Sequence, residues 1–329
     1  MAHQLAPIAV SCGEPAGIGP ELAHKARAAL HADLDFFVVG DPRHFAAHGP
    51  VAEITAPSEA SSMSGPELPV LPLDFGPSPV KKGRPDPNHA AKIVTAIETA
   101  VGLCQTGQAS ALCTLPISKI AVKAGGAFAF PGHTEFLAHL AGGSDVAMML
   151  ACDELRVVPV TIHIALRDVS KALTATKVEK VIRLTHAALR RDFGIARPRI
   201  AVAGVNPHAG ENGEMGQEEQ EWLAPLVENM RATGLDVTGP LPADTMFHAQ
   251  ARARYDAAVA MYHDQALIPI KTIGFDQGVN VTLGLPFVRT SPDHGTAFDI
   301  AGQGIARADS LIAALIMARD IALRRPAAA

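Results

Sequence analysis

The segment at residues 255–302 decides the fold, and it reads YDAAVAMYHDQALIPIKTIGFDQGVNVTLGLPFVRTSPDHGTAFDIAG. It opens with an apolar run at 257–261, which is typical of a strand covered on both faces of a parallel sheet. The run stops at Tyr262, His263 and Asp264, so polar side chains begin where the strand ends. This order predicts an α/β protein whose chemistry lies at the ends of its strands.

Groups suited to an anion follow within the same segment. Lys271, Asn280 and Arg289 can each donate hydrogen bonds to an anion, and the stretch HGT comes soon after, at 294–296. A strand-end histidine such as His263 is in addition a potential metal ligand. Each of these residues alone has an ordinary explanation as surface or turn, but their density in one segment indicates a functional site.

Short apolar runs alternate with amphipathic stretches along the rest of the chain. This alternation predicts largely parallel sheets with helices on both faces. The run at 68–73 differs, because Pro69 and Pro72 cannot donate to a ladder and reduce it to an edge strand or an extended segment. Strands are expected at 8–12, 36–39, 111–113, 146–151, 157–162, 200–203 and 235–237, and helices at 21–31, after Asn88 as cap, at 177–192 and at 309–324.

Length and composition limit the classes of function. A chain of 329 residues exceeds the usual size of one core, so two domains with a cleft between them are expected. A net charge of −5 without a basic run, with two Tyr and one Trp, argues against nucleic acid as a partner. The 4 cysteines form no Cys-x-x-Cys pair, and no apolar run approaches membrane-spanning length. We therefore expect a cytoplasmic protein with buried thiols and no membrane contact.

Two glycine-rich turns could approach a ligand. The first, GEPAGIGPE at 13–21, joins a strand to a helix, but its glycines do not have the G-x-G-x-x-G spacing and Pro20 removes one amide. The second, GPSPVKKGRPDPN at 76–88, carries lysines that could contact a ligand, although a solvated loop is the more common outcome. Neither turn alone identifies a function.

Other candidate residues stand at predicted element ends. Thr114, Ser118 and Lys119 follow a strand, at the edge of an α/β sheet where ligands bind. His133 precedes a helix that Thr134 could cap, and a helix N-terminus favours an anionic ligand. A histidine packed in a turn explains His133 equally well.

Three histidines, His163, His208 and His263, each follow an apolar strand within a few residues. Since parallel strands end at one edge of a sheet, these side chains can converge. Three imidazoles suit a divalent metal such as Zn²⁺ and leave positions open for substrate oxygens, as a catalytic site requires. Coincidence is a serious rival explanation, because the chain holds 14 histidines.

Long motifs resemble one known family, 4-hydroxythreonine-4-phosphate dehydrogenase of pyridoxal phosphate biosynthesis. The match covers nearly the whole chain and departs at Glu14, where the family usually has Asp. The motifs that carry it are GEPAGIGPE, TLPISK, FPGHTEF, HIAL, GVNPHAGENG, PADT, MYHDQ and the stretch from 270 to 302. The resemblance implies the two-domain fold of isocitrate and isopropylmalate dehydrogenases, with the active site in the interdomain cleft at a dimer interface. It implies a cofactor-side domain of 1–125 plus 274–329 and a metal and dimerisation domain of 126–273.

The resemblance also implies roles for individual residues in a homodimer that uses NAD or NADP. A divalent metal, with Zn²⁺ expected before Mg²⁺ or Co²⁺, would take ligands from both subunits among His163, His208 and His263. Substrate contacts would fall on His133, Thr134, Lys271, Asn280 and Arg289. Cofactor contacts would fall on Gly17, Gly19, His294, Gly295, Thr296 and Asp299. Proton transfer would fall to His133, Asp244 or Lys119.

The implied reaction is the NAD-dependent oxidation of the C3 hydroxyl of 4-phosphooxy-L-threonine to 2-amino-3-oxo-4-phosphooxybutanoate. Loss of carbon dioxide then gives 3-amino-1-hydroxyacetone 1-phosphate, a precursor of pyridoxine 5'-phosphate. A related dehydrogenase of a 4-phosphorylated sugar acid or an aromatic dihydrodiol carboxylate would keep the chemistry and change the substrate. A phosphotransacetylase-like acyltransferase would need neither NAD nor metal histidines, and a non-catalytic phosphate-binding protein is the simplest alternative.

Overall fold

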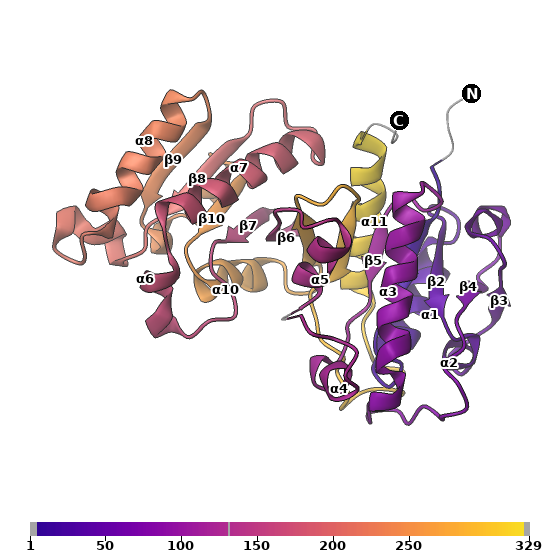
Figure 1. The fold of residues 1–329 in the computed structure, drawn as a ribbon. Helices are drawn as coiled ribbons and strands as arrows, with labels where there is room; N and C mark the ends of the chain where they lie inside the picture. The colour runs from indigo at the N-terminus through magenta and orange to yellow at the C-terminus, as the bar shows by residue number, and fades with distance from the viewer. Residues whose placement is uncertain (1–4, 131, 326–329) are drawn as a thin grey trace. The chain divides into compact units, whose positions relative to one another are not determined.

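The computed structural model describes residues 5–130 and 132–325, so Pro131 of the FPGHTEF motif lies outside the described part. The chain divides into two compact units (Figure 1). Unit 1 comprises Met1–Asp145 and Leu285–Ala329, and unit 2 comprises Val146–Gly284. Unit 1 is therefore discontinuous, because the chain leaves it for the whole length of unit 2 and then returns.

The unit boundaries fall at 145 and 285, whereas the resemblance put the domain boundaries at 125 and 274. Helix α5, His133–Leu140, belongs to unit 1 because it packs against α3, Ala90–Gln105. The division into a cofactor-side domain and a metal domain stays a prediction.

Unit 1 contains a parallel sheet. Val38 of β2 pairs with Val70 of β4, and Ala9 of β1 pairs with Leu112 of β5. Strands β1 and β2 are buried along their whole length, which explains their nearly unbroken apolar sequences. The strand order is β3 (Val51–Glu53), β4 (Leu68–Pro72), β2 (Phe36–Gly40), β1 (Ile8–Ser11), β5 (Leu112–Thr114) and β12 (Arg289–Pro292).

The expectation of an edge strand at 68–73 was wrong, because β4 lies between β3 and β2. Alternate residues of a parallel strand donate to opposite neighbours. The Leu68 amide donates to the Pro50 carbonyl, on the β3 side of β4. The nitrogen of Pro69 therefore faces β2 on the other side. The pairing of β2 with β4 begins only at the next residue, Val70. Pro72 faces β3 beyond the last pair of that strand, Glu53 with Val70. Both prolines therefore stand where no ladder bond is lost.

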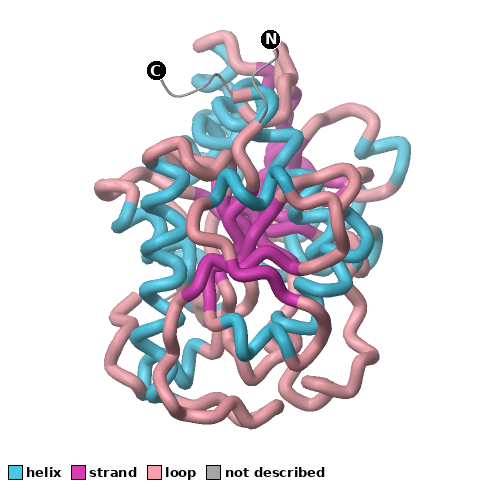
Figure 2. The backbone as a smooth tube through the Cα atoms, turned by 90° about the vertical axis from the view of Figure 1, so that its right-hand side faces the viewer, coloured by secondary structure: helices cyan, strands magenta, loops and turns pink. Residues whose placement is uncertain are grey.

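Helices cover both faces of the unit 1 strands. The connection from β1 through α1 (Gly19–Leu30) to β2 and that from β4 through α3 to β5 run in opposite directions along the sheet. Since such crossovers are right-handed, α1 and α3 lie on opposite faces. Figure 2 shows helices on either side of the strands. The remaining helices of this unit are α2 (Pro42–Ala46), α4 (Lys119–Ala124), α5, α11 (Asp309–Arg324) and the short turns η1 (Pro57–Ser62) and η2 (Pro87–His89).

Helix α3 does not begin at Asn88 as expected. The Asp86 side chain accepts a hydrogen bond from the Asn88 amide at 2.9 Å and caps η2, which leads into α3. The apolar side chains Ile93, Ile97 and Val101 of α3 are buried. Asp86 is the N-cap residue of η2 because its carboxylate accepts a hydrogen bond from the amide two residues ahead.

Unit 2 contains a mixed sheet. Strands β7, β10, β8 and β9 run parallel, while β6 runs antiparallel to both β7 and β11. The order is β11 (Val279–Leu283), β6 (Ala147–Cys152), β7 (Leu155–Pro159), β10 (Ala257–Ala260), β8 (Arg199–Ala203) and β9 (Asp236–Leu241). The prediction of a largely parallel α/β fold is confirmed.

The helices of unit 2 alternate with these strands. Ala266 and Ile270 of α10 pack into an apolar core with Val157 of β7 and Ala258 of β10. No helix within 5–130 and 132–325 is long and apolar enough to cross a membrane. The helices and helical turns are η3 (Leu166–Asp168), α6 (Val169–Ala172), α7 (Ala175–Arg191), η4 (Pro207–Gly213), η5 (Glu219–Leu223), α8 (Ala224–Ala232), η6 (Ala243–Thr245), α9 (Ala249–Arg252) and α10 (His263–Ile273).

Candidate functional site

The three predicted metal histidines follow three adjacent strands of unit 2. Strands β7, β10 and β8 are parallel neighbours, so their carboxyl ends lie at one edge of the sheet. His163 follows β7, His263 opens α10 directly after β10, and His208 lies in η4 after β8. The ring centroids of His163 and His263 are 5.9 Å apart. The structure therefore brings two of the three histidines together.

The backbone at two of these histidines is strained. His163 and His208 have φ values of 47° and 52°, in the left-handed region that residues other than glycine rarely adopt. His208 begins a run of positive φ that continues to Gly213. Such conformations cost about 1 to 3 kcal/mol each and concentrate at functional sites.

Carboxylates fix the orientation of two of the rings. Nδ1 of His263 lies 2.7 Å from Oδ1 of Asp264, and Nδ1 of His208 lies 3.0 Å from Oε2 of Glu211. The Glu211 contact also raises the pKa of His208. With Nδ1 occupied, Nε2 is the nitrogen left for a metal, as in carboxylate–histidine–metal arrangements. Sequence reasoning gave neither carboxylate a role, although an acidic residue one or three positions after a ligand histidine was a usable signal.

The donors at this edge suit a divalent metal but do not complete a site. Imidazole nitrogens are preferred ligands of Zn²⁺ and related metals, which need three or more protein ligands. Across the described residues, no group of three or more His, Cys, Asp and Glu side chains is arranged to hold a metal. His163 and His263 therefore supply at most part of a metal site within one chain.

Three further candidates lie in unit 2. Asp244 lies in η6, where its charge helps to raise the pKa of His208. It does not cap the next helix, because α9 begins five residues later, after His248. Lys271 lies in the last turn of α10, with its Nζ 5.8 Å from the ring centroid of Phe275, and Asn280 lies within β11.

Unit 1 holds a buried cation at the expected position. Arg289 is the first residue of β12 and is only 3 % exposed. Its guanidinium NH2 group donates to Oγ1 of Thr114, at the end of the neighbouring strand β5, over 2.7 Å. Burial lowers the Arg289 pKa to about 10, so the group stays charged at neutral pH. A buried charge of this kind is favourable where an anion compensates it.

His133 and Lys119 belong to the same group. Burial, followed by the charges of Arg289 and Lys119, lowers the pKa of His133 to about 3, so the imidazole is neutral at physiological pH. Its Nε2 is shielded from solvent and has no hydrogen-bond partner among residues 5–130 and 132–325. A Cβ at Gly132 would lie 3.5 Å from Lys119 Nζ, so that ammonium reaches the start of α5. Thr114, Lys119, His133 and Arg289 are called the cationic cluster below.

Thr134 does not cap α5 as expected. The N-cap residue of this helix is Gly132, and no side chain accepts a hydrogen bond there. Gly132 is fully extended, with φ −168° and ψ −175°, which starts the helix at His133 itself. Thr134 therefore lies one residue too late to cap, inside the first turn.

The predicted cofactor residues are brought together within unit 1. The Ile18 amide donates to the Thr296 carbonyl over 3.0 Å, and a Cβ at Gly17 would lie 2.8 Å from that oxygen. Gly19 begins α1, while a Cβ at Gly295 would meet nothing within 4 Å. Nδ1 of His294 lies 3.0 Å from the Gly295 carbonyl oxygen, and the backbone carbonyl of Asp299 accepts from the Gln303 side chain. Close backbone contact beside open space at Gly295 fits a ligand that lies against backbone.

Glu14, the departure from the family pattern, lies inside this loop. Its side chain is 1 % exposed and accepts from the Ala16 amide at 3.1 Å. The second carboxyl oxygen is buried, and no residue in the described part of the chain donates a hydrogen bond to it. Burial, together with the charge of Asp86, raises the Glu14 pKa to about 7.

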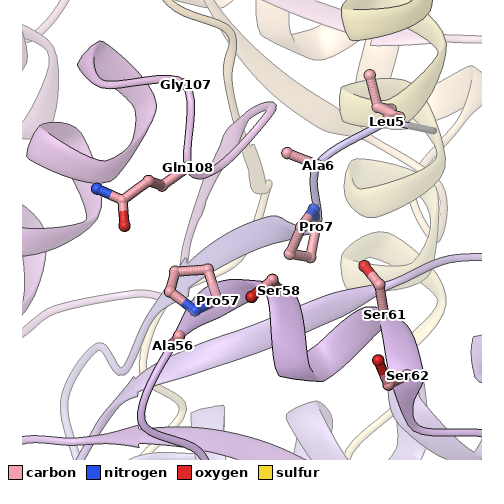
Figure 3. A pocket seen from close by; sticks show the side chains of 10 residues that line it. All are labelled: Leu5, Ala6, Pro7, Ala56, Pro57, Ser58, Ser61, Ser62, Gly107 and Gln108. Atoms are coloured by element: carbon pink, nitrogen blue, oxygen red, sulfur yellow. The ribbon is translucent and has the colours of Figure 1, made fainter. Parts of the chain in front are cut away.

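A separate cavity of about 430 Å³ lies elsewhere in unit 1 (Figure 3). Its walls come from the residues just before β1, from η1 and from the turn after α3. Among the residues that the structure describes, no charged side chain lines it. Since it adjoins the start of β1 and not the strand ends that carry the predicted residues, it is not part of the candidate site. It is lined by Leu5, Ala6, Pro7, Ala56, Pro57, Ser58, Ser61, Ser62, Gly107 and Gln108.

Comparison with known proteins gives consistent results. The family described as "Pyridoxal phosphate biosynthetic protein PdxA" matches residues 32–318. The chain is 60 % identical over 323 residues to the 4-hydroxythreonine-4-phosphate dehydrogenase of Paracoccus denitrificans (strain Pd 1222), covering 97 % of this chain and 98 % of the relative. A crystal structure of that dehydrogenase from Klebsiella pneumoniae matches with TM-score 0.87 and 44 % identity, covering 96 % and 99 %.

More distant solved structures are also similar. A terephthalate 1,2-cis-dihydrodiol dehydrogenase from Burkholderia xenovorans LB400 matches with TM-score 0.66 and 28 % identity, covering 96 % of this chain and 98 % of that one. A β-decarboxylating dehydrogenase from Thermococcus kodakarensis matches with TM-score 0.51 and 13 % identity, covering 97 % and 84 %, which shows a shared fold alone.

Proposed function

This chain belongs to the family of the pyridoxal phosphate biosynthetic protein PdxA, and on that premise we propose that it is a 4-hydroxythreonine-4-phosphate dehydrogenase. The proposed reaction oxidises the C3 hydroxyl of 4-phosphooxy-L-threonine. The hydroxyl gives up a proton and C3 gives up a hydride to NAD⁺ or NADP⁺, and the resulting β-keto acid then loses carbon dioxide. The observation that carries the proposal is 60 % identity to a named dehydrogenase across 97 % of the chain.

The cationic cluster supports a phosphorylated substrate. Arg289 is charged and buried, and its donor to Thr114 fixes the plane of the guanidinium. A phosphate offers oxygens for two parallel guanidinium donors and compensates the buried charge. We assign phosphate binding to Arg289 with Lys271, and assign Asn280 and Thr134 as neutral contacts to the substrate.

His133 supports proton handling. It is neutral in this structure because burial and two neighbouring cations lower its pKa to about 3. A bound phosphate would offset the charges of Arg289 and Lys119, and so raise the basicity of His133 when substrate is present. We propose His133 as the first candidate for the general base, with Lys119 and Asp244 as alternatives.

The histidine edge of unit 2 supports a shared metal site. We propose that His163 and His263 of one chain and His208 of a second copy hold one divalent metal, most simply Zn²⁺, with Mg²⁺ or Co²⁺ as alternatives. Such a metal would polarise the substrate oxygen, and the nicotinamide cofactor would accept hydride. Asp264 and Glu211 keep the imidazoles of His263 and His208 oriented.

We also propose that the protein works in the cytoplasm. The four cysteines, Cys12, Cys104, Cys113 and Cys152, are free. Unpaired thiols persist in a reducing compartment, where disulfides are rare.

The test is a direct assay with matched substrates. Purified protein with a divalent metal and NAD⁺ or NADP⁺ should reduce the nicotinamide when given 4-phosphooxy-L-threonine, measured by absorbance. The rate should fall sharply with unphosphorylated 4-hydroxy-L-threonine, because the cationic cluster then lacks its anion. Turnover of a terephthalate dihydrodiol in place of the phosphorylated substrate would assign the chain to the other dehydrogenase class.

A further inference from the structure

The predicted cofactor segments lack positive charge. Neither 13–20 nor 293–302 contains a lysine or arginine, while Asp293 and Asp299 add negative charge. A nicotinamide dinucleotide carries a pyrophosphate, and NADP carries a further phosphate. Phosphates in proteins are usually met by cations or by helix N-termini. Helix α1 begins at Gly19 inside the first segment, but Pro20 lacks an amide hydrogen, so we looked for a cation on another segment.

Lys25 is close to these segments, but its ammonium already donates to three protein oxygens. Its Nζ donates to Glu21 Oε1 at 2.8 Å, to the Gly304 carbonyl at 2.9 Å and to the Ala306 carbonyl at 2.5 Å. Three donors and three acceptors leave this ammonium saturated. It ties α1 to the chain after residue 302 and does not supply charge to a ligand.

A turn at 81–84 is built against both cofactor segments. The Gly83 amide donates to the Ala16 carbonyl over 2.7 Å, and a Cβ at Gly83 would lie 2.8 Å from the Phe298 carbonyl. The Arg84 amide donates to the Lys81 carbonyl at 2.9 Å, which closes the turn. Gly83 has a φ of 76°, so the position requires glycine for both its conformation and its space. A merely solvated loop would need neither constraint.

The Lys82 side chain lies against Gly302, the last residue of the second cofactor segment. A Cβ at Gly302 would overlap Cδ of Lys82 and would lie 3.2 Å from its Nζ. Gly302 therefore makes room for the lysine stem, and its φ of 78° again favours glycine. Lys82 is exposed at its end, together with Lys81 and Arg84 of the same turn. Three cations thus stand beside segments that have none.

We propose that the turn at 81–84 is the phosphate-binding wall of the cofactor site, with Lys82 as the contact to a phosphate of NAD or NADP. This inference rests on the proposed function, because it assumes that the chain binds a nicotinamide dinucleotide. The ammonium of Lys82 would donate a charge-assisted hydrogen bond to a phosphate oxygen. Gly83 lets the turn approach both cofactor segments, and Gly302 leaves room for the lysine stem.

The test measures binding without turnover. NADH and NADPH are titrated into the full-length protein, and the dissociation constant is read from nicotinamide fluorescence. Lys82→Ala should weaken binding about tenfold, as expected for one charge-assisted hydrogen bond. Lys177→Ala, which removes an exposed lysine in the first turn of α7, is the matched control and should bind as the wild type does. Lys82→Arg should recover most of the affinity, because it keeps the charge.

The two nucleotides distinguish the phosphate concerned. Equal losses for NADH and NADPH place Lys82 at the pyrophosphate, and a loss confined to NADPH places it at the 2′-phosphate. Lys82→Ala affinities within twofold of wild type for both nucleotides would overturn the inference while leaving the proposed function intact. A wild-type protein that binds neither nucleotide would overturn the proposed function and this inference together.

Discussion

The cationic cluster of unit 1 and the histidine edge of unit 2 differ in solvent exposure and in what shifts the pKa values of their side chains. Arg289 is 3 % exposed, whereas the side chains of His208 and His263 are 55 % and 40 % exposed. Desolvation is therefore the largest influence on the pKa of Arg289 and His133, while direct contact with Glu211 dominates at His208. The cationic cluster is therefore preorganised by burial within one chain, whereas the histidine edge relies on local carboxylates and on strained backbone.

Loss of a histidine at the exposed edge should have the largest effect. His163→Ala should remove metal and lower kcat/KM by on the order of 1000-fold or more, since Lewis-acid stabilisation is worth several kcal/mol. The melting temperature should change little, because His163 is exposed and outside the core. Metal content and steady-state rates measure this, and stoichiometric metal in a variant that lacks all three histidines would contradict it.

Mixing inactive variants tests which chain supplies each histidine, because His163 and His263 lie side by side within one chain. If His208 comes from the partner, exchanging His163→Ala with His208→Ala chains leaves one intact site per mixed dimer. Activity should then recover to roughly a quarter of wild type for random pairing in a two-fold dimer. His163→Ala mixed with His263→Ala should recover nothing, and recovery there would break the assignment.

The buried cluster should respond next most strongly. Arg289→Ala should lose about 2 to 5 kcal/mol of transition-state binding for 4-phosphooxy-L-threonine, the range for removing one partner of a buried charge pair. It should lose almost nothing for unphosphorylated 4-hydroxy-L-threonine. Measuring kcat/KM for both substrates with both proteins gives the coupling. Equal losses on the two substrates would mean that Arg289 supports the fold or the cofactor instead.

Burial in unit 1 should also produce a pH dependence of stability. The folded Glu14 carboxyl has a pKa raised from 4.5 to about 7, so the folded state holds a proton that the unfolded chain releases. Stability is therefore highest below about pH 4.5 for this group and falls as pH rises to 7, by about 3 kcal/mol in total. Glu14→Gln should flatten this trend in urea unfolding at pH 5, 6 and 7. Glu98→Gln, an exposed change on α3, should keep the wild-type trend.

The smallest effect should come from the hydroxyl that positions Arg289. Thr114→Val keeps the shape but removes the acceptor 2.7 Å from the guanidinium, so KM for the phosphorylated substrate should rise about tenfold with little change in kcat. Thr114→Ser should restore it. Thr290→Val is the control, because its buried hydroxyl donates to Ala314 and not to the guanidinium. A similar KM increase in Thr290→Val would mean that the loss is one of packing.

Much of the fold could be predicted from the sequence. The family, the largely parallel α/β fold and the dehydrogenase function are confirmed, and α11 occupies 309–324 as expected. Strand β12 was missed because its residues, Arg289 to Pro292, are polar yet buried and show no apolar run. The helix caps at Asn88 and Thr134 were wrong because a neighbouring residue held the cap position.

The candidate site was less predictable. The positions of three histidines after predicted strands indicated one shared edge of the sheet, because parallel strands run in the same direction. The side-chain contacts at the site depend on rotamers and on distant strands, which spacing does not encode. Thr114 and Arg289 are 175 residues apart in the chain, and only the pairing of β5 with β12 brings them together. The metal, substrate and cofactor roles of individual residues stay predictions.

The discontinuity of unit 1 has a consequence for synthesis on the ribosome. Unit 2 is one continuous segment and can fold as soon as it emerges, whereas the sheet of unit 1 lacks β12 until residues beyond Leu285 are made. Translation of the segment between Asp145 and Leu285 takes on the order of ten seconds at typical rates. During that time the nascent β5 has an unpaired edge where β12 will bind, so the first-made part of the chain is the last to be completed.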